Sequence, residues 1–280
     1  MSTYTVARDD FKNAARSYIV LGVVGVFAAL CGVVFLSEMN IYDDPYRTLF
    51  DVSAFVAFVF PLFLAPLAYL SITGDRTDGV IKYTMGLPNT RLEYFVGKLG
   101  SRLSVGVAAV VLGMVVSFVV AAATFVNAPS IARFATFTGL ALVYTFSFVG
   151  LFVAVSASTG KRSRAMLGVF GLYFLLVPFW FGFFPVISIT NLIETVASLL
   201  GVTVSENARQ YIITFSPATA YLRSTDLVYH GVAGNYDVFA QTFRGEELYD
   251  QPWFNVLEML AWGVVGLVVG YVKFDRSELG

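Results

Sequence analysis

The sequence predicts an all-α membrane protein with six transmembrane helices, an N-terminal interfacial helix, a helix in a cytoplasmic loop and an outer segment before the last span. Composition is the first observation behind this prediction. Of the 280 residues, 57% are hydrophobic and 13% are charged, and the mean hydropathy is +0.74. A soluble domain of this length cannot bury so much apolar surface, whereas a bilayer solvates it. Residues 1–280 are therefore treated as one transmembrane domain.

Six apolar stretches are the second observation. A helix needs about 20 mainly apolar residues to cross the hydrocarbon core of a bilayer, and each stretch is long enough. The first one lies where a signal peptide would lie. Its apolar run is too long and no A-x-A cleavage site follows it, so we interpret it as a retained span. The predicted spans are residues 17–36, 52–73, 103–126, 135–157, 166–189 and 254–272.

The distribution of Lys and Arg is the third observation. Thirteen of these residues lie in 1–16, 74–102, 158–165 and the C-terminal tail, whereas five lie in the opposite loops. Because loops rich in Lys and Arg stay in the cytoplasm, both termini are predicted to be cytoplasmic in a multi-pass protein of the cell membrane. Segments 37–51 and 190–253 are then outside. The five outer residues are Arg47, Arg133, Arg209, Arg223 and Arg244.

Residues 4–16 have the pattern of an amphipathic helix, because apolar and polar residues recur at helical spacing on opposite sides. Such a helix can lie in the headgroup layer, with its basic residues toward anionic lipid. The alternative is that it continues the first span into water. The apolar side is formed by Phe11, Ala14, Ala15 and Tyr18.

Prolines and glycines mark several spans. Pro61 and Pro66 lie in the second span, and Pro178 and Pro185 lie in the fifth. A proline removes a backbone hydrogen bond and kinks a helix, which a membrane tolerates where neighbours satisfy the freed carbonyls. Kinked spans often line a transport path but also occur in inert bundles, so Pro61, Pro66 and Pro178 are candidate path or gating residues. The pair Gly266-x-x-x-Gly270 permits close helix contact.

The outer segment 190–253 follows a cluster of aromatic residues. We interpret the cluster as an aromatic belt at the membrane surface, in preference to a ligand platform. Residues 189–200 are expected to form a short helix that partly re-enters the bilayer, and the remainder is expected to pack as a small outer cap. The aromatic residues are Phe179, Trp180, Phe181, Phe183, Phe184, Trp253 and Phe254.

The residues needed for catalysis or metal binding are sparse. His230 is the one histidine and is expected to be exposed, and Cys31 is the one cysteine, so no zinc site or internal disulfide is predicted. Residues 158–163 superficially match a phosphate loop but lack its first glycine and the Ser or Thr after the lysine. Lys161, Arg162 and Arg164 are interpreted instead as a positive-inside anchor. A net charge of −1 gives no support for nucleic-acid binding.

Glu258 is the one acidic residue predicted to lie within the bilayer, about one turn into the sixth span. Intramembrane acids can mark ion or substrate pathways, so Glu258 is a further candidate for the path. Its side chain is expected to reach the interface by snorkelling.

The most structured polar segment is the cytoplasmic loop of residues 74–102. Its acidic start at Asp75 and Asp78 suits the N-terminal end of a helix dipole, and Gly79 loosens the chain. An amphipathic helix over residues 76–87 is predicted to lie parallel to the membrane. Its apolar stripe follows the spacing i, i+3, i+4 and i+7 and consists of Val80, Tyr83, Thr84 and Leu87.

Two signals end this helix and start the next. Gly86 and Pro88 disfavour helix continuation. Thr90 and Glu93 have capping-box spacing, which starts the helix that becomes the third span. An exposed apolar stripe needs a partner. Docking of the helix into a groove of another protein, and packing against lipid headgroups or the chain's own span ends, are both consistent with the pattern.

The segment DRTDGVIKYTMGLPNTRLEYFVGK, residues 75–98, resembles the coupling segment of ABC-2-type transporter permeases. That segment usually opens with a Glu-led acidic-basic-acidic triplet; here Asp75 and Asp78 stand instead with Thr77 interposed, which preserves the charge. The span count and the outer segment extend the resemblance over nearly the whole chain. The chain is similar to the six-span group that includes the permease of the nitrous-oxide-reductase maturation system. The matching residues are Gly79, Ile81, Leu87, Pro88, Arg91, Glu93, Gly97 and Lys98.

The resemblance implies a transporter subunit with no catalysis or cofactor of its own. Two permease chains would pair as a homodimer, and each would hold a cytoplasmic ABC ATPase subunit that binds ATP and Mg²⁺. Closure of the ATPases would push on the helix over 76–87 and reorganise a path between the kinked spans, with export implied rather than import. The residues implied to couple to the ATPase are Asp75, Arg76, Asp78, Gly79, Val80, Ile81, Tyr83, Thr84, Leu87, Pro88, Arg91 and Glu93.

Two other readings of the sequence stay open. A secondary transporter would show a buried, substrate-facing charge and internal hydropathy repeats, and neither is clear in this sequence. A membrane scaffold that moves no solute has no distinguishing sequence feature. The transported substrate is not readable from the sequence.

Overall fold

The protein is described from a computed structural model, which describes residues 3–183, 187–232 and 247–277. These residues form helices and turns, without β-strands. The all-α class predicted from the sequence is therefore confirmed. Phe184, Pro185 and Arg244, which the sequence analysis names, lie outside the described residues.

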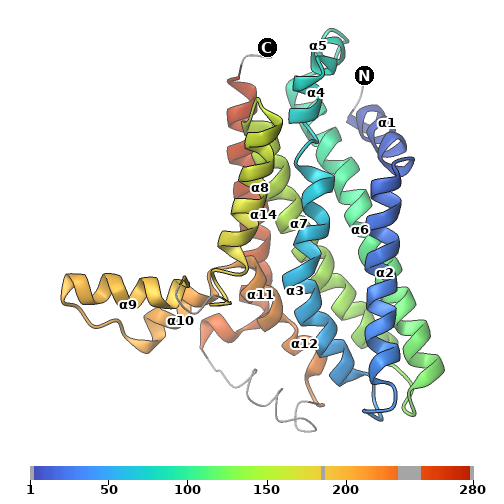
Figure 1. Cartoon of the computed structure of the whole chain (residues 1–280), viewed down its shortest axis with the longest axis vertical. Helices are drawn as coiled ribbons and strands as arrows, with labels where there is room; N and C mark the ends of the chain where they lie inside the picture. The colour runs from blue at the N-terminus through green and yellow to red at the C-terminus, as the bar shows by residue number, and fades with distance from the viewer. Residues whose placement is uncertain (1–2, 184–186, 233–246, 278–280) are drawn as a thin grey trace.

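Five long helices run side by side and form a bundle (Figure 1). All five are long and apolar enough to cross a membrane. We call the end of the bundle that carries both termini the upper end and the opposite end the lower end, as they are drawn in Figure 1. The helices are α2 (Tyr18–Glu38), α3 (Tyr46–Ala68), α6 (Arg91–Thr124), α7 (Ile131–Ser158) and α14 (Pro252–Asp275).

The predicted fifth span, residues 166–189, begins as α8 (Arg162–Leu176), which packs beside α3 and α7. This helix has only 15 residues, fewer than the about 17 that a spanning helix needs. It ends because Pro178 cannot continue it; the chain turns, and Phe179 N donates to Phe174 O at 3.0 Å. The described helices thus confirm five candidate spans, and a sixth is not confirmed.

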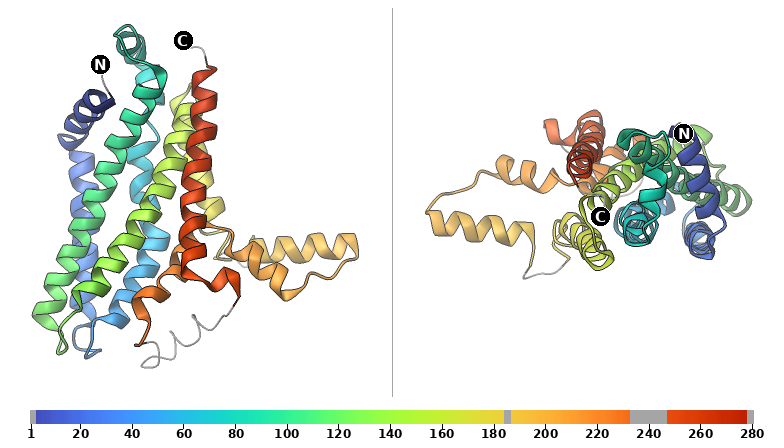
Figure 2. Two further views of the ribbon diagram at one scale, coloured as in Figure 1. Left: turned by 180° about the vertical axis from the view of Figure 1, so that it is seen from behind. Right: turned by 90° about the horizontal axis from the view of Figure 1, so that it is seen from above.

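Two short helices, α9 (Ile189–Leu200) and α10 (Glu206–Thr214), leave the bundle sideways (Figures 1 and 2). The helix expected over 189–200 is present and points away from the bundle, and its partial entry into the bilayer stays a prediction. The following helices return to the lower half, where α11 (Pro217–Ser224) packs against α14, α3 and α7, and α12 (Asp226–Tyr229) packs against α7. A short turn of 3-10 helix, η2 (Leu248–Asp250), precedes α14.

The core of the bundle is built around α7, the most buried of the five candidate spans. Glycines let α14 approach it closely. A Cβ atom on Gly270 would lie 2.5 Å from the Cα atom of Ala154, and one on Gly263 would lie 3.2 Å from the Cα atom of Ser147. The Ser147 hydroxyl also donates to Met259 O at 2.6 Å. The small residues of α14 therefore form the helix contact that the sequence predicts.

Pro61 and Pro66 both lie within α3. Because Pro61 has no N–H, the carbonyl of Ala57 loses its helical donor. The buried Tyr144 hydroxyl of α7 donates to that carbonyl at 2.6 Å. The Tyr173 hydroxyl of α8 donates to the neighbouring carbonyl of Phe58 at 2.9 Å. The expectation that neighbouring helices satisfy the freed carbonyl is confirmed at Pro61.

Candidate functional site

The loop between α3 and α6 forms two short helices at the upper end, α4 (Thr73–Thr77) and α5 (Val80–Met85) (Figure 1). The single helix predicted over 76–87 is therefore wrong. Gly79 separates the two, because its φ of 73° lies in the left-handed region that favours glycine. The chain changes direction there, and α5 ends at Met85, before Gly86 and Pro88 as predicted.

The predicted cap of the next helix is present. Glu93 N donates to Thr90 Oγ1 at 3.2 Å, and Thr90 N donates to Glu93 Oε2 at 2.8 Å. This reciprocal pair is a complete capping box. It starts α6, which continues without a break for 34 residues, so the loop is joined rigidly to a long helix of the bundle.

One side of α5 is buried, whereas the described chain covers the other side only in part. Ile81 is fully buried and anchors α5 to the bundle. Three apolar side chains on α5 and just after it are open: Val80 is 45% exposed, Tyr83 83% and Leu87 44%. We call these three residues the α5 stripe. The described chain covers the stripe only in part, so both alternatives left open by the sequence stay open here.

A cavity of about 440 Å³ lies beside the stripe. It separates α5 from the N-terminal helix α1 (Thr3–Ala15), and its floor is formed by α6. Val80 and Leu87 of the stripe reach into it. The other lining residues are Val6, Asp9, Asp10, Asn13, Asp75, Thr84, Tyr94 and Lys98.

The helix α1 is separate from α2, because Ser17 between them is extended. It packs on α6, where Gly97 makes the contact possible: a Cβ there would lie 2.7 Å from the Cβ of Val6. The apolar side predicted from the sequence is buried against the chain only in part. Val6 and Ala14 are the buried positions, whereas Phe11 is 37% exposed and Tyr18 is 91% exposed. The helix thus turns a face toward α6 that contains Val6, Asp10 and Ala14 at four-residue spacing.

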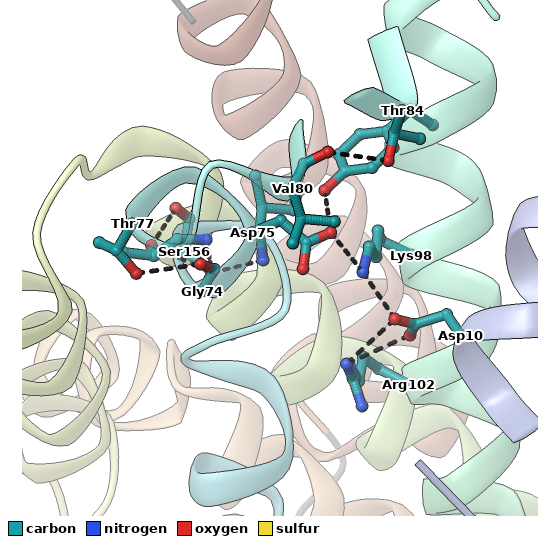
Figure 3. A network of polar contacts seen from close by, with 12 residues as sticks. Asp10, Gly74, Asp75, Thr77, Val80, Thr84, Lys98, Arg102 and Ser156 are labelled. Carbon is teal, nitrogen blue, oxygen red and sulfur yellow. Dashed lines mark hydrogen bonds and ion pairs between the residues drawn. The ribbon is translucent and has the colours of Figure 1, made fainter. Parts of the chain in front are cut away.

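Charged side chains join α1, α4 and α6 (Figure 3). Lys98 Nζ lies 2.6 Å from Asp10 Oδ1 and 2.7 Å from Asp75 Oδ2. Arg102 contacts Asp10 at 3.2 Å, and the Tyr94 hydroxyl donates to Asp75 at 2.6 Å. The Lys98 side chain is only 9% exposed. We call these five residues the charge cluster.

The electrostatics of Asp10 follow from this arrangement. Burial alone raises the pKa of the Asp10 carboxyl, but the positive charges of Arg102 and Lys98 outweigh burial and lower the pKa below its ordinary value of 3.8. Asp10 is therefore ionised at neutral pH. Because it is largely withdrawn from water, its pairing with Lys98 is less screened than a surface ion pair.

The α4 helix is also joined to α7. Ile72 N and Thr73 N each donate to the Ser156 hydroxyl at 3.1 Å, and the Thr73 hydroxyl donates to Ser156 O at 2.6 Å. These groups are buried, so breaking the contact leaves polar atoms without water.

Two arginines join the loop to the end of α14. Arg76 donates to the Ser277 hydroxyl at 2.6 Å and lies over the Phe274 ring at 5.1 Å. Arg91 donates to the backbone carbonyls of Phe274 and Ser277 at 3.0 and 2.9 Å, and also to that of Asp275. Positive charge at a helix C-terminus complements the helix dipole.

A further pair joins the loop to α8. Arg162 lies 2.5 Å from Asp78 and donates to the Thr77 hydroxyl at 2.9 Å. Arg162 therefore has a specific partner beyond the general anchoring role that it was assigned together with Lys161 and Arg164. Both side chains of the pair are about half exposed. An exposed ion pair contributes little to the free energy of folding, so we infer that this pair mainly orients the loop relative to α8.

The candidate path residues lie in different parts of the bundle and do not come together at one place. They also lie apart from the loop contacts described above. Pro61 lies in the second half of α3, Pro66 lies two residues before the end of α3, and Pro178 lies just beyond α8. Glu258 is in the lower half of α14 and is 8% exposed. Little of its side chain therefore reaches the surface of the described chain, and its snorkelling to the membrane interface stays a prediction.

Sequence reasoning missed three residues that hold the loop: Asp10, Ser156 and Ser277. A signal existed only for Asp10, whose four-residue spacing from Val6 and Ala14 places it on the buried face of α1. Ser156 and Ser277 act through contacts with residues 83 and 201 positions away, for which the sequence carries no pattern.

The comparisons with known proteins agree with this architecture. A family model described as ABC-2 family transporter protein matches residues 4–279, nearly the whole chain. A comparison with curated proteins finds no match. A match of this extent covers α1, the loop and every described helix of the bundle. The chain therefore belongs to the ABC-2 family of transporter proteins and is a multi-pass membrane component of an ABC transporter.

Proposed function

We propose that this chain is the permease subunit of an ATP-driven exporter, and that the α5 stripe is where a separate ABC ATPase subunit docks. The main observation that supports this proposal is the exposure of the stripe. Three apolar side chains stand open at the upper end of the molecule, beside a cavity of about 440 Å³. An apolar helix face next to a groove suits docking of a partner helix.

The contacts beneath the stripe support a coupling role. The α4 helix is joined to α7 by Ser156, to α14 by Arg76 and to α8 by Asp78. The charge cluster adds α1 and α6. A displacement of α5 therefore acts on five helices at once, through buried or charge-assisted contacts.

The orientation and assembly belong to the same proposal. The upper end carries most Lys and Arg, so we place it and both termini in the cytoplasm of the cell. Two copies pair, and each binds one ATPase that supplies ATP and Mg²⁺. The chain itself then needs no cofactor, and lipid surrounds the five long helices.

Co-expression with the cognate ATPase tests the docking surface. Val80→Asp and Leu87→Asp place a charge on the stripe, and we expect loss of the co-purifying ATPase and at least a tenfold fall in coupled ATP hydrolysis. The matched control is Leu227→Asp in α12, because Leu227 is 51% exposed and lies toward the lower end. The proposal is wrong if both stripe variants retain the ATPase as fully as the control does.

A further inference from the structure

Glu258 is an acidic side chain inside the bundle that forms no ion pair among the described residues. Only 8% of it is exposed, and its Oε1 atom is buried without a hydrogen-bond partner among the described residues. Arg223, whose charge acts on Glu258, is already paired with Asp250. Leaving a carboxyl group unpaired in an apolar setting is costly, so a ligand that supplies the missing hydrogen-bond donor would be stabilised here.

The carboxyl group faces a cavity of about 250 Å³ lined by Phe215, Glu258, Ala261, Trp262 and Val265. Glu258 contributes the only acidic group among these lining residues. Two of the lining residues are aromatic: the ring centroids of Phe215 and Trp262 lie 5.3 Å apart, and the ring planes are inclined by 50°. The Trp262 indole is near enough to act on Glu258, but its Nε1 atom makes no hydrogen bond of ordinary geometry to described residues.

The cavity is reached from the flank of the bundle. Val265 is 59% exposed and Phe215 is 56% exposed, and Ala261 is also exposed. Each of these residues is apolar, and α14 is one of the helices long enough to cross a membrane. A molecule that reaches Glu258 by this route therefore comes from the hydrocarbon side of the molecule and must carry an apolar body.

We propose that this cavity binds the ammonium head of a cationic amphiphile, whose hydrocarbon chain lies along the exposed flank of α14. A carboxylate forms strong charge-assisted hydrogen bonds with an ammonium group. The two aromatic walls add cation–π attraction, which is strongest where water is excluded. The volume is below that of a typical drug-sized pocket and suits a head group. Use of the site for uptake of transported substrate from the bilayer rests on the proposed function.

Tryptophan fluorescence can report on this site alone. The chain has three tryptophans, and a Trp180→Phe, Trp253→Phe background leaves Trp262 as the sole emitter. We would titrate the purified full chain in lipid nanodiscs with dodecylammonium, and with dodecanol as the uncharged chain of equal length. We expect a saturable change of Trp262 emission with dodecylammonium, and binding that is about tenfold or more weaker in Glu258→Gln.

Glu206→Gln is the matched control, because Glu206 is exposed in α10, and we expect it to bind as the background does. If Glu258→Gln fails to fold, Ala261→Phe fills the cavity from an exposed position and is expected to abolish the change. The proposal is overturned if no saturable change occurs, if Glu258→Gln binds equally well, or if dodecanol binds as tightly as the amine. No ATPase is present, so these outcomes are independent of the docking test.

Discussion

At the scale of single residues, Lys98 connects parts of the chain that are far apart in sequence. It pairs with Asp10 of α1 and with Asp75 of α4, and its side chain is 9% exposed. This lysine does more than contribute positive charge to a cytoplasmic loop, because its ammonium group forms ion pairs with two carboxylates where little water has access. The glycine before it, Gly97, has no side chain to hold α1 away. The Gly-Lys pair of the loop motif therefore has a physical reason.

Lys98→Met tests this arrangement. Removing one partner of a buried ion pair leaves the other charge uncompensated, which costs roughly 3–5 kcal/mol. We expect a lower unfolding midpoint in detergent and earlier proteolysis near residue 10. The control is Lys82→Met, because Lys82 is exposed on α5 and forms no ion pair among the described residues. Equal midpoints for the two variants would contradict the role given to Lys98.

The lowered pKa of Asp10 gives a pH dependence. A carboxyl whose pKa is lower in the folded state stabilises that state at pH values above its unfolded pKa, ordinarily 3.8. This contribution is lost as pH falls through the folded pKa. We expect acid below about pH 4 to loosen α1, as a spin label on α1 would report. Asp10→Asn should lack this component of the acid transition, and an unchanged transition in that variant would count against it.

At the scale of elements, the contact of α14 with α7 depends on glycine. A Cβ at Gly270 would lie 2.5 Å from backbone Cα of Ala154, and a backbone atom cannot move aside cheaply. We expect Gly270→Ala to lower the unfolding free energy by about 1–3 kcal/mol. Gly171→Ala in α8 is the matched control, since nothing lies within 4 Å of a Cβ there. The denaturant midpoint distinguishes them, and a Gly270→Ala protein as stable as the control would refute the contact.

The same scale shows what the sequence could and could not predict. Apolar runs located the five long helices, because hydrophobic length alone determines whether a helix can span a bilayer. The capping box at Thr90 and Glu93 was also readable, since it is a local pattern. The early end of α8 was not, because its apolar residues continue past Leu176 and only Pro178 signals the turn. The direction of α9 depends on packing between distant segments.

Within the loop, local sequence signals predicted the turns and helix ends, but they did not predict the contacts between distant residues. Gly79, the stripe and the stop at Gly86 were found from spacing and residue type. The break between α4 and α5 was missed because a positive φ at Gly79 interrupts the helix completely, whereas the sequence indicates only flexibility. The partners of Arg76 and Asp78 lie 201 and 84 residues away. No single sequence pattern predicts contacts at such separations.

At the scale of the whole molecule, both termini, α4 and α5 lie at one end of the bundle (Figures 1 and 2). The loop contacts converge at that end. The Glu258 cavity lies at the opposite, lower end of α14, far from the α5 stripe. A transporter built this way would receive force at one end and handle its substrate near the other. The long helices between them, α7 and α14 above all, pack closely enough to transmit a rigid-body movement.

The central claim is that the α5 stripe contacts the ATPase, and site-specific cross-linking tests it most directly. Tyr83 is 83% exposed at the centre of the stripe, so a photoreactive residue can replace it without disturbing the core. In the complex co-expressed with the ATPase, we predict a covalent adduct at position 83 and none at position 227. A complex that co-purifies intact but yields no adduct at position 83, or yields one at position 227 instead, would contradict the claim.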